Sequence, residues 1–333
     1  MKKVSLAALL VMSAVLLFFG SCAKKDPEKI YVLRPDWHGV MQVSAEGSES
    51  VLSKRTAFPA VDSDTFYYLE DDTTLVRLSL SAGSEERFPL PDGFENCKSI
   101  VPYENAAYVH LKNADGDSCV YKVDSDGWKF VAPSNYEFNF AVGDGAVYCF
   151  RDGKEPGYSE LIRADIATGD ITSVCEPTIG QVNCVDVYNG RVYVGYFDND
   201  TYGWLCSSFD AVRGGDEKCE TPSGPVAPED YTDELKREHP MMGNFAIHDG
   251  WFYFYEFGEP ETTRRLMARR ISDGKLIEYF AIENANGSAG LDSGTLSDRI
   301  TFGKTGFVFA IGNDYSPDDD VDTVEFKFYP YKK

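Results

Sequence analysis

Tight-turn residues followed by a short strand rich in aromatic and β-branched residues recur along this chain, and this repeat constrains the fold most. The clearest copies occupy residues 144–150, 189–194 and 249–254, and each begins with Asp-Gly or Asn-Gly. These dipeptides favour the tight turns that join antiparallel strands, because both central residues of such turns need positive φ. Weaker copies occupy residues 64–69, 105–109 and 305–309. The pattern therefore predicts antiparallel strand pairs along most of the chain.

A second unit, built from an alternating strand, a turn that ends in Gly and another strand, follows several of these copies. The clearest example runs from Leu161 to Val174 through Thr168-Gly169, and other turns contain Asp126-Gly127, Asp273-Gly274, Ala82-Gly83 and Glu46-Gly47. The first unit starts at residues 64, 105, 144 and 189, so the repeat lengths are 41, 39 and 45 residues. Later spacings of 60 and 56 residues indicate insertions near residues 223–243 and 284–299.

A four-strand unit repeated about every 40 residues is typical of a β-propeller blade. One small sheet cannot bury both of its faces, but blades stacked around an axis bury each face against the next blade. The sequence predicts an all-β propeller of seven blades, with six or eight left open. Its candidate units start near residues 30, 57, 97, 136, 182, 244 and 297. We expect the first unit to lack its opening strand and the last its closing strand; a β-sandwich is the alternative fold.

The repeats resemble those of bacterial WD40-like and PQQ-like propellers. The resemblance lies in Asp144-Gly145-x-Val147-Tyr148, followed by Asp165-x-x-Thr168-Gly169, and in the weaker copies across residues 30–333. PQQ-like repeats usually carry a Trp shortly after the Thr-Gly turn, and this chain has none near Ser173. The resemblance therefore implies a propeller fold but no quinone, and we expect no cofactor.

The N-terminus has the three parts of a bacterial export signal. Met1-Lys2-Lys3 is followed by an apolar run from Val4 to Phe19 and then by Gly20-Ser21-Cys22. A run of about 16 residues is shorter than the roughly 20 that a membrane-spanning helix needs. The ending resembles the lipobox of lipoproteins, which implies that Cys22 is lipidated. We therefore expect a signal peptide over residues 1–21, a lipidated linker over 22–29 and a propeller domain over 30–333, held on a membrane of the cell envelope.

The chain is strongly acidic, with a formal net charge of −22. Removal of residues 1–21 takes away two lysines and no acids, so the mature chain carries −24. Nucleic acid and anionic lipid would repel such a chain, which excludes nucleic acid as an expected partner.

Seven cysteines remain if Cys22 carries lipid, and an exported protein can form disulfides. Cys206 and Cys219 flank one predicted hairpin and are the most plausible bridge. The alternative is that all seven cysteines are small buried apolar residues. No Cys/His cluster has the spacing of a zinc site, and we expect no metal.

Two further groups of residues are candidate sites. Arg264, Arg265, Arg269 and Arg270 form the only dense basic cluster, which could bind a carboxylate or phosphate, or could pair internally with neighbouring acids. Asn113-x-Asp115-x-Asp117 has the alternate oxygens of a calcium loop but lacks the later Glu, so a polar hairpin turn explains it equally well.

The sequence contains no linear catalytic motif. His-Glu-x-x-His, Gly-x-Ser-x-Gly and the Gly-x-x-x-x-Gly-Lys phosphate loop are all absent, so no catalytic residue is assigned. The favoured hypothesis is a membrane-anchored propeller that binds another envelope protein without chemistry of its own. The alternative is a propeller that handles a ligand or carbohydrate, including as a hydrolase, with carboxylates in its central pocket.

Overall fold

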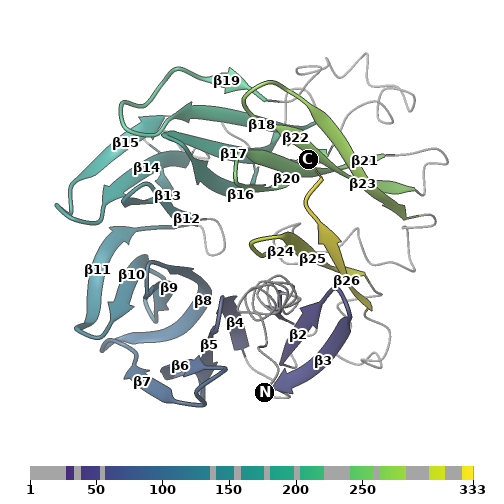
Figure 1. The fold of residues 1–333 in the computed structure, drawn as a ribbon. Coiled ribbons are helices and arrows are strands. Elements are labelled where there is room, and N and C mark those ends of the chain that lie inside the picture. The colour runs from purple at the N-terminus through teal and green to yellow at the C-terminus, as the bar shows by residue number, and fades with distance from the viewer. Residues whose placement is uncertain are drawn as a thin grey trace, which may run out of the picture.

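The computed structural model describes residues 28–33, 39–52, 57–135, 140–153, 159–175, 181–198, 203–220, 241–257, 263–282, 300–311 and 325–332. These residues form seven antiparallel sheets that surround a common axis (Figure 1). The prediction of an all-β, seven-bladed propeller is confirmed. The predicted insertion at 223–243 lies mostly outside the described residues, as do the signal peptide and Cys22.

We number the blades in chain order. Blade 1 contains β1 (Ile30–Leu33), β2 (Val40–Ser44) and β3 (Gly47–Leu52). Blade 2 contains β4 (Ala57–Asp62), β5 (Thr65–Glu70), β6 (Thr74–Ser79) and β7 (Glu85–Pro89). Blade 3 contains β8 (Phe94–Tyr103), β9 (Ala106–Asn113), β10 (Ser118–Asp124) and β11 (Gly127–Pro133). Blade 4 contains β12 (Phe140–Gly143), β13 (Ala146–Asp152), β14 (Ser159–Asp165) and β15 (Ile171–Cys175).

Blade 5 contains β16 (Gln181–Tyr188), β17 (Arg191–Asp198), β18 (Gly203–Asp210) and β19 (Lys218–Cys219). Blade 6 contains β20 (Met241–His248), β21 (Trp251–Phe257), β22 (Arg264–Arg270) and β23 (Leu276–Ile282). Blade 7 contains β24 (Ile300–Phe302), β25 (Gly306–Ile311) and β26 (Glu325–Pro330). Within this described part of the chain, no helix is both long and apolar enough to cross a membrane.

The core lies between the blades rather than inside any one of them. Seven hydrophobic clusters each join two neighbouring blades, including the pair formed by blades 7 and 1. The second strand of each complete blade supplies much of this core, because its side chains are buried on both faces. Its third residue is a buried Tyr in all five complete blades: Tyr67, Tyr108, Tyr148, Tyr193 and Tyr253. The aromatic repeat in the sequence therefore marks the contacts between blades.

The ring closes without a shared strand among the described residues, since blades 1 and 7 each have three strands. Glu28, just before β1, accepts hydrogen bonds from the turn after β24, so β1 starts at the end of the ring where β24 stops. The second strand of each complete blade also starts at this end, so β1 runs in the direction of a second strand. The structure thus agrees with the prediction that the first unit lacks its opening strand and the last its closing strand.

Candidate functional site

The tight turns gather at one end of the ring, which we call the turn face. It contains the turns between first and second strands and those between third and fourth strands. A recurring backbone hydrogen bond joins the two kinds of turn within a blade, with N···O distances of 2.8–3.1 Å. Its donor and acceptor pairs are Leu80 and Asp64, Ile166 and Gly145, Ala211 and Gly190, Ile271 and Gly250, and Tyr331 and Thr305.

The turns between third and fourth strands of blades 4 and 5 share one construction. In blade 4, Asp165 Oδ1 accepts the N–H groups of Ala167 and Thr168, each at 3.0 Å, and Gly169 has a φ of +79°. The N–H of Thr168, the Arg163 guanidinium and the N–H of Ala167 stabilise the charged carboxylate and lower the pKa of Asp165 to about 2. Asp210 and Gly214 occupy the same positions in blade 5. The Gly-ended turns predicted from the sequence are therefore confirmed.

Carboxylates also fasten neighbouring blades to one another. Asp144 Oδ2 accepts the N–H of Gly190 at 2.8 Å, which links blades 4 and 5. Asp186 Oδ2, on the inner strand β16, accepts the N–H of Ile247 on β20 at 3.0 Å. The N–H of Val187 also donates to Asp186, at 2.8 Å, but burial outweighs both N–H groups and raises the pKa of Asp186 to about 6.

Glu28 forms the corresponding link between blades 1 and 7. Its carboxylate accepts the N–H groups of Lys304 and Thr305 and the Thr305 hydroxyl, with the Thr305 N–H at 2.7 Å. Burial raises the pKa of Glu28, but these hydrogen bonds outweigh burial and leave it below its usual value.

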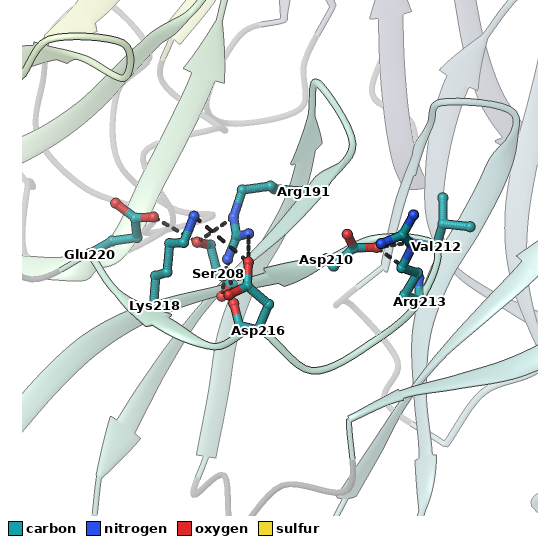
Figure 2. A network of polar contacts seen from close by, with 8 residues as sticks. All are labelled: Arg191, Ser208, Asp210, Val212, Arg213, Asp216, Lys218 and Glu220. Atoms are coloured by element: carbon teal, nitrogen blue, oxygen red, sulfur yellow. Dashed lines mark hydrogen bonds and ion pairs between the residues drawn. The ribbon is translucent and has the colours of Figure 1, made fainter.

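Arg191 organises the polar network in Figure 2. Its Nε donates to Ser208 Oγ at 3.0 Å, Nη1 donates to Asp216 Oδ2 at 2.8 Å, and Nη2 donates to the carbonyls of both residues at 2.8 and 2.7 Å. These bonds tie the start of β17 to the segment that leads into β19. Arg191 and the 3.7 Å ion pair with Lys218 lower the pKa of Asp216. The guanidinium is engaged by its own blade rather than presented to a ligand.

The network continues into blade 6 through Glu220. Ser208 Oγ donates to Glu220 Oε1 at 2.6 Å, and Arg269 Nη2 donates to Glu220 Oε2 at 3.1 Å. The Arg269 guanidinium also lies over the Phe252 ring, 5.5 Å from its centroid. Glu220 and Arg269 therefore link blades 5 and 6, and Arg191 supports Glu220 from within blade 5 through Ser208.

The four arginines predicted as a binding cluster all lie on β22, but they are not together. Arg264 and Arg265 begin the strand, whereas Arg269 and Arg270 end it at the turn face, about 20 Å away at 3.3 Å per residue. Arg265 lies 4.0 Å from Glu278, and Arg270 lies 3.0 Å from Asp273 and over the Trp251 ring. The contacts are those of the internal-pairing alternative. Anion binding by these residues stays a prediction.

The register between β18 and β19 is unfavourable for the predicted disulfide between Cys206 and Cys219. Cys219 on β19 lies opposite Ser207, and alternation along β18 directs the Cys206 side chain to the other face of the blade. Cys206 is buried and Cys219 is exposed. Burial raises the pKa of the Cys206 thiol, and it raises those of Cys97 and Cys149 to about 12. The bridge stays a prediction. The alternative of seven buried cysteines holds for Cys97, Cys149 and Cys206, whereas the other four are partly or fully exposed.

The described part of the ring shows no cluster of three or more His, Cys, Asp or Glu side chains that could hold a metal ion. At the predicted calcium loop, Asn113 Oδ1 accepts the N–H of Asp117 at 2.8 Å, and Asn113 Nδ2 donates to Asp117 Oδ2 at 3.2 Å. These bonds close a polar hairpin turn. The buried His110 contacts the Ser134 carbonyl at 3.1 Å. These arrangements stabilise turns and strands and do not assemble a nucleophile with a base.

Charge on the turn face is mainly negative. Its turns and chain ends carry the acids Glu28, Glu46, Asp64, Glu104, Asp126, Asp144, Asp170, Asp216, Glu217, Asp249 and Asp273. They carry the bases Lys29, Arg213, Lys275, Lys304 and Lys332. Sequence reasoning did not single out Arg191, Asp186 or Glu28, because each acts on a residue far away along the chain. The spacing of Asp165 with Gly169 and of Asp210 with Gly214 was the one available signal for the turn carboxylates.

Comparisons with known proteins support the fold. No protein-family model matches this chain. No curated protein matches it either. Among solved structures, an oligogalacturonate lyase in complex with manganese has a TM-score of 0.55 and 10% identity, covering 91% of this chain and 88% of that one. TolB from Acinetobacter baumannii has a TM-score of 0.46 and 15% identity, covering 81% of this chain and 67% of that one. At 10% identity the likeness to the oligogalacturonate lyase shows the fold alone, and the likeness to TolB carries no argument at its TM-score.

Proposed function

We propose that this chain is a bacterial cell-envelope lipoprotein whose propeller binds or scaffolds another envelope protein without catalysis of its own. The proposal rests on one observation: charged side chains of the described residues link neighbouring blades to one another. Arg191, Glu220 and Arg269 form one network across blades 5 and 6, and Asp144 and Glu28 fasten other blade pairs. These groups hold the ring together, as a rigid scaffold requires.

The binding role is supported by the asymmetry between the two ends of the ring. The turn face has short turns closed by hydrogen bonds within each blade. At the opposite end, strands are joined by longer segments, including 221–240, 283–299 and 312–324, which lie outside the described residues. Binding residues concentrate on loops that a rigid scaffold positions, so the end with the longer connections is the better candidate for a partner.

Attachment to the membrane is supported by the sequence alone. Gly20-Ser21-Cys22 ends an apolar signal core, and acyl chains on Cys22 would hold the ring at a bilayer surface. The mature charge disfavours nucleic acid and leaves proteins of the envelope as the expected partners.

The test combines two measurements on the full chain expressed in a bacterium. Metabolic labelling with a palmitate analogue, compared between the wild type and Cys22→Ser, should label only the wild type. Affinity capture from cross-linked envelopes, followed by mass spectrometry, should recover a discrete partner, and deletion of residues 224–242 should weaken its capture. Labelling of Cys22→Ser would contradict the anchor. Cleavage of a polysaccharide by the purified ring would support the hydrolase alternative instead.

A further inference from the structure

The position of Glu28 fixes where the chain enters the ring. Its carboxylate binds Lys304 and Thr305, in the turn between β24 and β25. The entry side is therefore the turn face. Gly303 of the same turn packs closely against Ile30 of β1, because a Cβ added at Gly303 would lie 2.4 Å from Ile30 Cδ1. The first described residues are thus held against blade 7 by both polar and apolar contacts.

The linker between this point and the lipid is short. Cys22 stands six positions before Glu28 in the sequence. An extended chain of that length spans at most about 20 Å. A ring attached at one end by so short a tether cannot turn its opposite end to the same surface. The tether is no longer than a blade is tall, since the seven residues of β13 span about 20 Å and the ten residues of β8 span about 30 Å.

We propose that the propeller is held with its turn face toward the lipid bilayer and its opposite end, with the longer connections, directed away from the membrane. This orientation rests on the proposed lipidation of Cys22. The turn face therefore faces the bilayer surface and not a protein partner. The acids of the turn face are repelled by anionic lipid, so the ring stands off at the reach of the linker instead of lying flat. A protein partner would approach the end that points away from the membrane.

Three exposed alanines provide matched positions for the test. Ala82 and Ala167 lie in turns of the turn face, and Ala114 lies in the turn between β9 and β10 at the opposite end. Each is replaced by cysteine in the full chain and labelled with a donor dye, in a Cys219→Ser background. Cys219 is the exposed cysteine among those that the structure describes. The lipidated protein is then placed in phosphatidylcholine vesicles that carry an acceptor dye on their headgroups.

Energy transfer should be about twofold higher from Ala82→Cys and Ala167→Cys than from Ala114→Cys, because the two ends lie at least about 20 Å apart. Glu28→Ala, which removes the hydrogen bonds to Lys304 and Thr305, should reduce this difference. Equal transfer from the three positions, or the highest transfer from Ala114→Cys, would overturn the orientation.

A second preparation separates this inference from the proposed function. The chain begins at residue 22, with a hexahistidine tag in place of Cys22, and binds vesicles that contain a nickel-chelating lipid. The same ranking of transfer is expected, and its reversal would overturn the inference. If the ranking holds while mass spectrometry finds no acyl chain on native Cys22, the tether geometry stands and the lipoprotein function fails.

Discussion

Gly214 and Gly169 form a matched pair that tests how closely blades 4 and 5 pack. Both are the positive-φ glycines of equivalent turns, with φ of +71° and +79°. A Cβ on Gly169 would meet nothing within 4 Å, whereas a Cβ on Gly214 would lie 2.4 Å from the Val174 carbonyl oxygen. That oxygen already accepts the N–H of Gly215 at 3.0 Å. Alanine at residue 214 must therefore push the turn away from blade 4.

The expected loss in the free energy of unfolding has two parts, backbone strain and close packing against Val174. Left-handed backbone costs an L-residue about 1–2 kcal/mol, and both Gly169→Ala and Gly214→Ala incur this cost. Gly214→Ala adds overpacking, about 1–3 kcal/mol, and loses a backbone hydrogen bond worth about 1 kcal/mol. We expect Gly214→Ala to lower the free energy of unfolding by about 2–4 kcal/mol more than Gly169→Ala does. The backbone strain cancels in this comparison.

Thermal unfolding followed by circular dichroism, together with urea titration, measures the difference. Gly214→Ala should melt about 4–8 °C below Gly169→Ala, at roughly 2 °C per kcal/mol for a domain of this size. The urea slope should be the same for both, which shows that the native fold is kept. Equal melting temperatures for the two variants would refute the close contact between residue 214 and Val174.

Three further perturbations test the links between blades. Burial raises the pKa of Asp186 to about 6 in the folded chain, so ionisation of this carboxyl lowers the stability of the fold as the pH rises from about 4 to about 6. The stability of Asp186→Asn relative to wild type should therefore improve by about 1–2 kcal/mol between pH 4 and pH 8 in urea titrations. Glu28 has a lowered pKa, so its stabilisation is fully present above pH 4.5 and is lost as the pH falls through the pKa of the folded chain. Glu28→Gln should cost about 1 kcal/mol at pH 7 and less on acidification. A double-mutant cycle of Glu220→Gln and Arg269→Gln should give a coupling near 1 kcal/mol, and additive effects would contradict the ion pair across blades 5 and 6.

The strands and turns could be predicted from the sequence because they obey local rules. Asp144-Gly145, Asn189-Gly190 and Asp249-Gly250 each take positive φ at both residues, as the tight-turn interpretation requires. The alternation and aromatic content of the following strands reflect burial on both faces between blades. Even the incomplete first and last units could be recognised, since a missing strand removes a whole turn-and-strand pattern.

The links between blades could not be predicted in the same way, because they join residues far apart in the sequence. Asp144 and Gly190 are 46 positions apart, Asp186 and Ile247 are 61 apart, and Glu28 and Thr305 are 277 apart. Nothing local distinguishes Asp186 from other strand acids. For the arginines, proximity in sequence was misleading: β22 is extended, so Arg264 and Arg270 lie at opposite ends of the blade.

The closure at Glu28 connects the stability of the ring with its proposed attachment. Blades 1 and 7 share no strand among the described residues, so this seam depends on the Glu28 hydrogen bonds and on the apolar cluster of Ile30, Val32, Val43 and Val308. With acyl chains on Cys22, any pull on the anchor would reach the ring first at Glu28, beside that seam. Tension directed along β1 would have to break the carboxylate link before it could separate the apolar cluster. The bonds that close the propeller are therefore the same ones that would bear its load at the membrane.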